Sequence, residues 1–186
     1  MSVNLAKHYF TVSEYDRMGE TGVFAPGARV ELIEGEIIEM SPIGSRHAAC
    51  VERIRDHLHE FARRRFLVRT QNPIVLNDFS EPQPDISVLR FREDYYDKAH
   101  PRPQDVLLVI EVADTTFPFD RQVKLPLYAR AGIPEFLLFN LPKDEIEWFS
   151  QHELGAYQNH QVLKRGDRFE SVIVPGLTLD IEAILG

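Results

Sequence analysis

The sequence predicts a mixed α/β protein whose twisted, mixed β-sheet is flanked by helices. One observation is a helical stripe between positions 45 and 66, where apolar residues recur every three or four positions with Arg and Glu opposite. Another is the segment VLLVIEVA at 106–113, a continuous apolar run typical of a central strand buried on both faces. Shorter strand-like runs precede and follow a second helical segment, so helices and strands are interspersed along the chain.

The residues before the long helix predict a short helix and a hairpin. The segment TVSEYDRM at 11–18 is typical of a helix whose N-terminus is capped by Thr11 or Ser13. The segment RVELIEGEIIEM has two apolar runs around Glu34-Gly35. This pattern predicts a hairpin, because glycine accepts the positive φ that a tight turn requires.

After the long helix, residues 66–78 predict two short strands, and PDISVLR at 84–90 predicts another. The segment DRQVKLPLYAR at 120–130 predicts a helix that Pro126 should weaken or kink. The remaining predicted elements are strands at 133–141 and 145–151, a hairpin around 165–167, and a final apolar strand or turn at 177–185.

The chain length of 186 residues favours one domain spanning residues 1–186. The 44% hydrophobic and 27% charged residues are close to the averages for globular proteins, which argues against a disordered chain. The single cysteine, Cys50, cannot form an internal disulfide, and the N-terminal residues lack the apolar core of a signal peptide. We therefore expect a cytoplasmic location, with Cys50 as a buried structural thiol rather than a nucleophile.

The net charge of −8 counts against a general nucleic-acid binder, because contacts to phosphates need concentrated Lys and Arg. Local charge matters more than the total, however. Arg63, Arg64 and Arg65 form one basic cluster, and several acidic residues could be gathered around a metal ion. The composition therefore leaves a nuclease possible.

Two acidic residues are embedded in apolar strand segments, where charged side chains are rare. Asp85 opens the predicted strand DISVL, and Glu111 interrupts VLLVIEVA. A carboxylate in such a place needs a partner charge, a metal or a proton. Two of them on neighbouring strands predict a site for Mg²⁺ or Mn²⁺, which prefer oxygen ligands. The structural alternatives are a strand-entry turn for Asp85 and an ion pair with a buried Arg or Lys for Glu111.

Lys124 is the third member of the predicted site. In the helix at 120–130, Asp120, Lys124 and Tyr128 are spaced i, i+4 and i+8, so they share one face. A cation facing two carboxylates could stabilise negative charge on a phosphate or orient the attacking water. Taken alone, Lys124 would more often be a solvated helix residue, but the three residues together indicate metal-assisted hydrolysis of a phosphodiester.

The segments VELIEGEIIEM, EPQPDISVLR, VLLVIEVADTT and DRQVKLPLYARAGIPEF resemble the Uma-two family of endonucleases, a group within the PD-(D/E)XK nuclease superfamily. The resemblance covers residues 12–141. It implies a restriction-endonuclease-like core and a metal-dependent endonuclease that hydrolyses phosphodiester bonds of nucleic acid, with DNA as the expected substrate. It also implies a homodimer.

The resemblance also assigns residues. Asp85 matches the aspartate of the PD pair, and Glu111 matches the acidic residue of the second half-motif. Both carboxylates and the main-chain carbonyl of Val112 would hold the metal. The sequence departs from the superfamily pattern at Ala113, where lysine is expected. In this family the following helix supplies the lysine, and Lys124 matches that variant.

Two further residues match family positions near the site. Glu31 could complete the outer shell of the metal, although a hairpin residue facing solvent is the structural alternative. His47, at the start of the long helix, could act on a water or a phosphate, and a capping or packing histidine is an equally good interpretation. Residues expected only to support the site are Gln83, Asp120 and Tyr128.

Other classes of function remain open at this stage. The fold could persist without catalysis as a DNA-binding or protein-interaction module, although the intact Asp85, Glu111 and Lys124 argue against this. The acidic residues could also serve a different phosphoryl or sugar substrate. The sequence has no Walker loop, no Gly-rich dinucleotide fingerprint and no Ser elbow. A zinc site is unsupported, because the seven histidines have no cysteine partners at ligand spacing.

Overall fold

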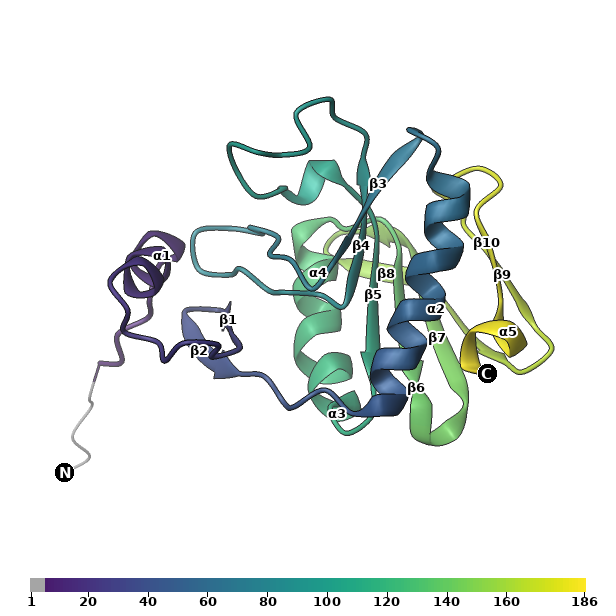
Figure 1. Ribbon diagram of the computed structural model, residues 1–186, viewed down its shortest axis with the longest axis horizontal. Coiled ribbons are helices and arrows are strands. Elements are labelled where there is room, and N and C mark those ends of the chain that lie inside the picture. Colours follow the sequence, from purple (N-terminus) through teal and green to yellow (C-terminus); the bar gives the residue numbers. More distant parts are fainter. Residues whose placement is uncertain (1–5) are drawn as a thin grey trace.

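The computed structural model describes residues 6–186, so residues 1–5 of the predicted domain 1–186 lie outside the described residues. A six-stranded sheet in the order β3-β4-β5-β6-β7-β8 forms its centre (Figure 1). Neighbouring strands are antiparallel except for β5 and β6, which are parallel, so the predicted mixed sheet is confirmed. The strands are β3 (Phe66–Thr70), β4 (Ile86–Arg90), β5 (Val106–Ala113), β6 (Phe136–Asn140), β7 (Glu145–Glu153) and β8 (Ala156–Lys164).

Both faces of the sheet are covered. Helix α2 (Ser45–Ala62) and the C-terminal segment pack on one face around Leu108, Ile110 and Val112. Helix α4 (Leu125–Ala131) packs on the other face, where Val109 and Ala113 point. Strand β5 is therefore apolar on both sides, as the continuous run predicted. Glu111 is the exception, and it lies on the face of α4.

The N-terminal elements confirm the sequence prediction. Helix α1 (Val12–Glu20) begins after Thr11, whose side chain accepts from the Glu14 N–H while the Glu14 carboxylate accepts from the Thr11 N–H. Strands β1 (Val30–Ile33) and β2 (Glu36–Glu39) pair as an antiparallel hairpin. Its two turn residues, Glu34 and Gly35, have φ of 49° and 80°, as a tight two-residue turn requires.

Helix α2 is shorter than predicted. It ends at Ala62, and Arg63 and Arg64 adopt left-handed conformations with φ of 32° and 65°, so the chain turns back into β3. Of the two strands predicted at 66–78, only the first is present, and the second run lies in a loop. None of the helices among residues 6–186 has the length and hydrophobicity needed to cross a lipid bilayer.

The predicted hairpin around residues 165–167 is wrong. Strand β8 pairs with β7, whereas β9 (Arg168–Glu170) pairs with β10 (Thr178–Asp180) in a separate two-stranded sheet. Helix α5 (Ile181–Leu185) follows and ends the chain. The turn at 165–167 therefore joins two sheets, which turn residues alone cannot distinguish from a hairpin.

A buried carboxylate attaches the C-terminal segment to the sheet. Glu135, which is fully buried before β6, accepts hydrogen bonds from the Trp148 indole N–H at 3.0 Å and the Val172 N–H at 3.1 Å. The Ser171 hydroxyl donates to its other oxygen. Because three donors satisfy this carboxylate, its burial costs less than that of an isolated charge.

The helix predicted at 120–130 is built from three pieces. Helix α3 (Phe117–Phe119) leads into η2 (Asp120–Lys124), a wide turn of π type, and then into α4. In the wide turn the Leu125 N–H donates to the Asp120 carbonyl, five residues back. The distortion lies directly before Pro126, which has no N–H and crowds the preceding turn. The remaining short elements are η1 (Pro103–Asp105) and η3 (Leu141–Lys143).

Glu81 is a buried carboxyl that is expected to make stability depend on pH. Its main chain pairs with Leu32, and its side-chain Oε2 has no hydrogen-bond partner among residues 6–186. Burial, with a smaller contribution from Asp16, raises the pKa of Glu81 to about 7. Below its ordinary pKa of 4.5 the group is protonated in both the folded and unfolded chain. Between 4.5 and 7 only the folded chain keeps the proton, so stability falls as pH rises.

We expect Glu81→Gln to be more stable than wild type at pH 8, by at most about 3 kcal/mol, and to lose this advantage near pH 4. Urea unfolding at the two pH values measures the difference. Glu153→Gln, which alters an exposed carboxylate on β7, is the matched control and should change little at either pH. A Glu81→Gln chain no more stable than wild type at pH 8 would contradict the expectation.

Candidate functional site

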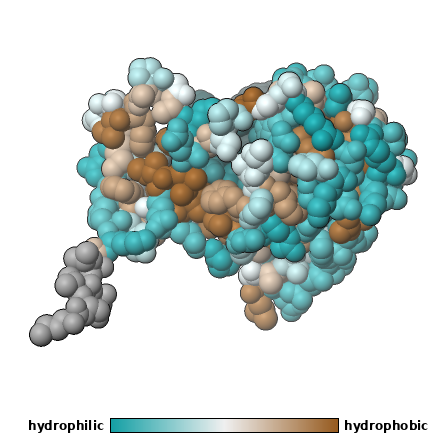
Figure 2. Space-filling view, turned by 90° about the horizontal axis from the view of Figure 1, so that it is seen from below, coloured by the Kyte–Doolittle hydropathy of each residue, from teal (hydrophilic) through white to brown (hydrophobic). Residues whose placement is uncertain are grey.

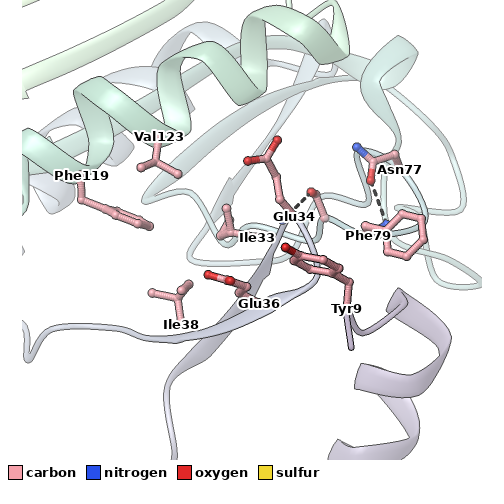
Figure 3. A pocket seen from close by; sticks show the side chains of 10 residues that line it. Tyr9, Ile33, Glu34, Glu36, Ile38, Asn77, Phe79, Phe119 and Val123 are labelled. Atoms are coloured by element: carbon pink, nitrogen blue, oxygen red, sulfur yellow. Dashed lines mark hydrogen bonds between the residues drawn. The ribbon is translucent and has the colours of Figure 1, made fainter. Parts of the chain in front are cut away.

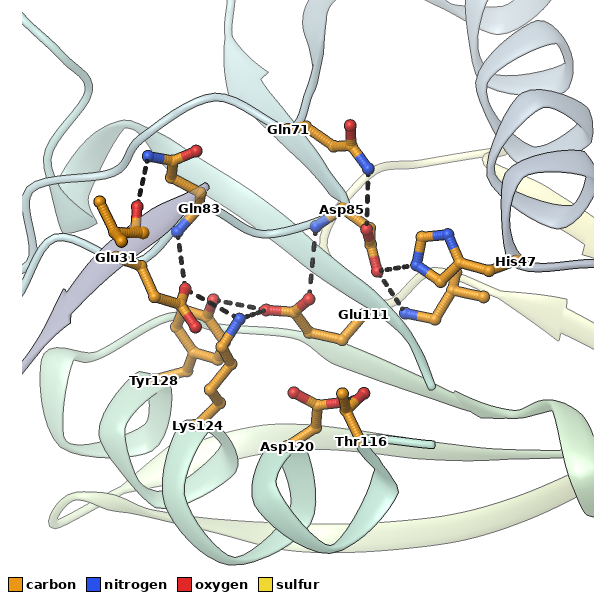
Figure 4. A network of polar contacts seen from close by, with 12 residues as sticks. Glu31, His47, Gln71, Gln83, Asp85, Glu111, Thr116, Asp120, Lys124 and Tyr128 are labelled. Carbon is orange, nitrogen blue, oxygen red and sulfur yellow. Dashed lines mark hydrogen bonds and ion pairs between the residues drawn. The ribbon is translucent and has the colours of Figure 1, made fainter. Parts of the chain in front are cut away.

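The ends of β4 and β5 bring the two predicted carboxylates together (Figure 4). The main-chain pairing between these strands ends at Ile86 and Ile110. Beyond this point, contacts between main-chain N–H groups and side-chain carboxylates link the two strands. The Asp85 N–H lies 3.3 Å from Glu111 Oε2, and the Val112 N–H donates to Asp85 Oδ2 at 2.9 Å. Because the N–H and C=O of one strand residue point to the same neighbour, the Val112 carbonyl also faces the Asp85 side of β5.

Lys124 reaches this pair from the helix that follows β5. Its Nζ lies 3.1 Å from Glu111 Oε1 and 3.0 Å from Glu31 Oε2, and its side chain is only 4% exposed. The Tyr128 hydroxyl donates to the same Glu111 oxygen at 2.8 Å. The expected common face of the helix thus points at Glu111, and Lys124 is not a solvated helix residue.

Glu31 is brought to the site by the β1–β2 hairpin. Its carboxylate is buried rather than exposed to solvent, and Oε2 also accepts from the Gln83 N–H at 3.1 Å. The Gln83 side chain in turn donates to the Val30 carbonyl at 3.1 Å. These two hydrogen bonds of Gln83 hold the residues before Asp85 against the β1–β2 hairpin that carries Glu31.

His47 approaches from the first turn of α2. Its Nε2 lies 3.0 Å from Asp85 Oδ2, while its Nδ1 is buried without a hydrogen-bond partner among the described residues. Gln71 contacts the other oxygen of Asp85, with Nε2 3.4 Å from Oδ1. No pattern in the sequence identifies Gln71, because a polar residue after a strand is ordinary in a loop.

A pocket of about 560 Å³ opens onto these groups. Asp120 lies on its wall, where the Thr116 hydroxyl donates to Asp120 Oδ2 at 2.7 Å. The lining of this pocket also includes Glu31, His47, Asp85, Glu111, Val112 and Lys124. Every residue predicted for the site is thus adjacent to one cavity.

The charges of the site do not balance. Four carboxylates with exposed fractions between 2% and 7% surround a single buried lysine; they are Glu31, Asp85, Glu111 and Asp120. Burial raises the pKa of Glu111 to about 8, although Lys124 opposes the shift, and burial also raises the pKa of Asp120. Burial alone would lower the pKa of Lys124, but Glu111, Glu31 and Asp120 together raise it. The lysine therefore stays charged, whereas the raised pKa values of Glu111 and Asp120 show that their negative charges are costly in this pocket without a further cation.

The donor chemistry fits a hard divalent cation. Asp85, Glu111 and the Val112 carbonyl offer only oxygen atoms, which Mg²⁺ and Mn²⁺ prefer, and the excess negative charge would be compensated by a cation. As placed, Glu111 faces Lys124 and Asp85 faces His47. Among residues 6–186, no three His, Cys, Asp or Glu side chains are already arranged around a common point. Small rotations of the two carboxylates would have to accompany metal binding.

The basic cluster at Arg63, Arg64 and Arg65 is not part of this site. It follows the C-terminal end of α2, whereas His47 lies at the N-terminal end. Arg63 follows His47 by 16 positions, which corresponds to about 24 Å at the helical rise per residue. The cluster therefore cannot offset the acidic charge next to Asp85.

Two adjacent central strands of a mixed sheet thus bring two carboxylates together, and a buried lysine contacts one of them. A crystal structure described as "a putative nuclease belonging to DUF820", from Anabaena variabilis ATCC 29413, shares this fold with a TM-score of 0.72 and 14% identity, covering 95% of this chain and 97% of that chain. The family model described as "Uma2: Putative restriction endonuclease" matches residues 12–182, so the chain belongs to this family. No curated protein matches the sequence.

The match confirms the resemblance read from the motifs and extends it beyond residue 141. The family and the fold support a nuclease of the restriction-endonuclease type.

Proposed function

We propose that the protein is a metal-dependent endonuclease that hydrolyses phosphodiester bonds of DNA. The observation that carries the proposal is the excess of buried carboxylates around one buried lysine, in a pocket at the ends of two neighbouring strands. Such an excess is costly unless a cation compensates it. The nuclease fold and family support the assignment of a nucleic acid as the substrate.

In this proposal Asp85, Glu111 and the Val112 carbonyl hold Mg²⁺ or Mn²⁺. A divalent cation bound there would polarise the scissile phosphate and make a water more acidic. Lys124 stays protonated beside Glu111 and offers a positive charge that stabilises the negative charge developing on the phosphate. Tyr128 donates to Glu111 and holds that carboxylate in position.

Glu31 and His47 act at the edges of the proposed site. Glu31 shares Lys124 with Glu111, so it fixes where the ammonium group lies and can accept a hydrogen bond from a water. His47 touches Asp85 through Nε2, which orients that carboxylate, and it can exchange a proton with a water or a phosphate. Both residues line the pocket and are within reach of a substrate there.

We also infer that residues 1–186 act as one domain and that the chain functions as a cytoplasmic homodimer. The two strands of a duplex need two cuts, and a pair of identical sites related by a twofold axis supplies them. The single cysteine, Cys50, is consistent with a reducing compartment, and burial raises its pKa to about 12, as expected of an unreactive thiol.

Cleavage assays test the proposal. Purified protein is incubated with plasmid DNA, single-stranded DNA and RNA, with Mg²⁺, Mn²⁺ or EDTA. We expect cleavage of DNA with either metal and none with EDTA. Glu111→Gln should lose this activity because it removes a charge from the metal site, whereas Glu60→Gln, on the exposed side of α2, should keep it.

Absence of cleavage by the wild type with every metal and substrate would contradict the proposal. Binding of DNA without cleavage would then favour a nuclease-fold binding module. Equal cleavage by Glu111→Gln and wild type would remove Glu111 from the mechanism, and cleavage of RNA alone would correct the substrate.

A further inference from the structure

A larger cavity, of about 790 Å³, lies beside the candidate metal site (Figure 3). We call it the aromatic groove and define it by its apolar lining residues, which are Tyr9, Ile33, Ile38, Phe79, Phe119 and Val123. Tyr9 is 49% exposed and Phe79 is 45% exposed, which is unusual for large side chains of this kind. Hydrophobic residues gather in a hollow on the face seen in Figure 2.

The hairpin turn holds the two exposed aromatic residues in place. The Gly35 N–H donates to the Phe79 carbonyl at 2.7 Å, and the Gly35 carbonyl accepts from the Phe10 N–H at 2.9 Å. A Cβ atom at position 35 would lie 2.6 Å from the Tyr9 Cβ, so only glycine allows Tyr9 this close approach. The Asn77 side chain also accepts from the Phe79 N–H at 2.8 Å. The main chain that carries the aromatic walls is therefore held in place before any ligand arrives.

The aromatic groove adjoins the pocket of the metal site. Ile38 and Phe119 line both cavities. A strand whose phosphate lies beside Asp85 and Glu111 would therefore place a neighbouring part of itself in the groove.

The rim of the groove carries balanced charge. Glu34 pairs with Arg130 at 2.6 Å, and Glu36 pairs with Lys7 at 3.4 Å. A groove without net charge does not attract phosphate, but its aromatic walls suit a flat, uncharged ring. Nucleic-acid bases have this character, and they stack on aromatic side chains regardless of sequence.

We propose that the aromatic groove binds an unpaired base of the strand that is cut at the adjacent metal site. This inference rests on the proposed nuclease function and names its substrate class more closely. The phosphate stays in the acidic pocket with the metal, and the base enters the neutral groove. Single-stranded or distorted DNA fits directly, whereas an intact duplex must first turn a base out of its stack.

Binding of oligonucleotides tests the inference separately from cleavage. Single-stranded oligonucleotides, intact or with one abasic position moved along the strand, are titrated with Ca²⁺ in place of Mg²⁺. We expect Phe79→Ala and Tyr9→Ala to weaken binding of the intact strand by roughly 5- to 100-fold. Tyr95→Ala is the matched control, because Tyr95 is 59% exposed and lies outside the groove.

The abasic series identifies the base. Wild type should bind more weakly when the base that enters the groove is missing. Phe79→Ala should bind this abasic strand and the intact strand equally well. Equal binding of intact strands by wild type and both groove variants would overturn the inference even if DNA is cleaved, and so would a wild type that binds no strand. Groove variants that change only the oligomeric state would overturn it too, because the groove would then be a contact between copies. Binding without cleavage would sustain it and contradict only the proposed catalysis.

Discussion

Asp85→Asn is expected to lower the rate of Mg²⁺-dependent DNA cleavage by about 10³-fold. The substitution keeps the shape of the side chain and an oxygen that can accept from the Val112 N–H. It removes the negative charge that a divalent cation needs, and such a cation contributes several kcal/mol to stabilising charge in the transition state. The measurement is the initial rate of cleavage at saturating metal, together with metal affinity from calorimetry.

The control for this prediction is Asp56→Asn, which removes an exposed carboxylate from α2 and should leave the rate unchanged. Thermal unfolding should show that both variants are folded. An Asp85→Asn enzyme that cleaves within a few-fold of wild type would exclude Asp85 as a metal ligand.

Lys124→Met is expected to lower the free energy of unfolding by about 3–5 kcal/mol and to abolish cleavage. The lysine is the only cation within contact of Glu31 and Glu111 among residues 6–186, so its loss leaves buried carboxylates without a partner. Urea unfolding measures the change. The double variant Lys124→Met/Glu111→Gln should recover part of the lost stability, because one of the unpaired charges is gone.

The loss of stability in Lys124→Met should also depend on pH. Without Lys124, burial still favours the protonated form of Glu111, so the variant gains stability as pH falls and its deficit relative to wild type shrinks. Lys98→Met, at an exposed position, is the matched control and should be neutral. A Lys124→Met chain as stable as wild type at pH 8 would show that the ion pairs contribute nothing to folding.

The elements with strong local signals were predicted well. The capping residues around Thr11, the Glu34-Gly35 turn and the apolar run of β5 each specify their structure within a few residues, and all three were confirmed. The pairing of β9 with β10 was missed because the turn residues at 165–167 are the same whether the chain folds back as a hairpin or passes into a second sheet. The end of α2 was misplaced because Arg63 and Arg64 are good helix formers that the fold holds in a left-handed conformation.

The residues proposed for the site from the sequence lie close together in the structure, but their contacts were not predicted. A carboxylate inside an apolar strand is conspicuous in the sequence, which identified Asp85 and Glu111. Nothing in the spacing showed that Lys124 would bridge Glu111 and Glu31, since this depends on where the hairpin packs. Gln71 on Asp85 was invisible for the same reason, because its contact is made by tertiary structure alone.

The wide turn η2 affects how this site can change during evolution. Side chains alternate between the two faces of a strand, so the direction of a lysine on a strand depends only on whether its position is odd or even. A lysine on a helix is aimed by an angle that accumulates at about 100° per residue, so one residue more or less between Phe119 and Tyr128 would turn Lys124 or Tyr128 away from Glu111. Exposed positions such as Gln122 can therefore vary freely in identity. An insertion or deletion in this segment, by contrast, is expected to disrupt the site as strongly as replacement of the lysine itself.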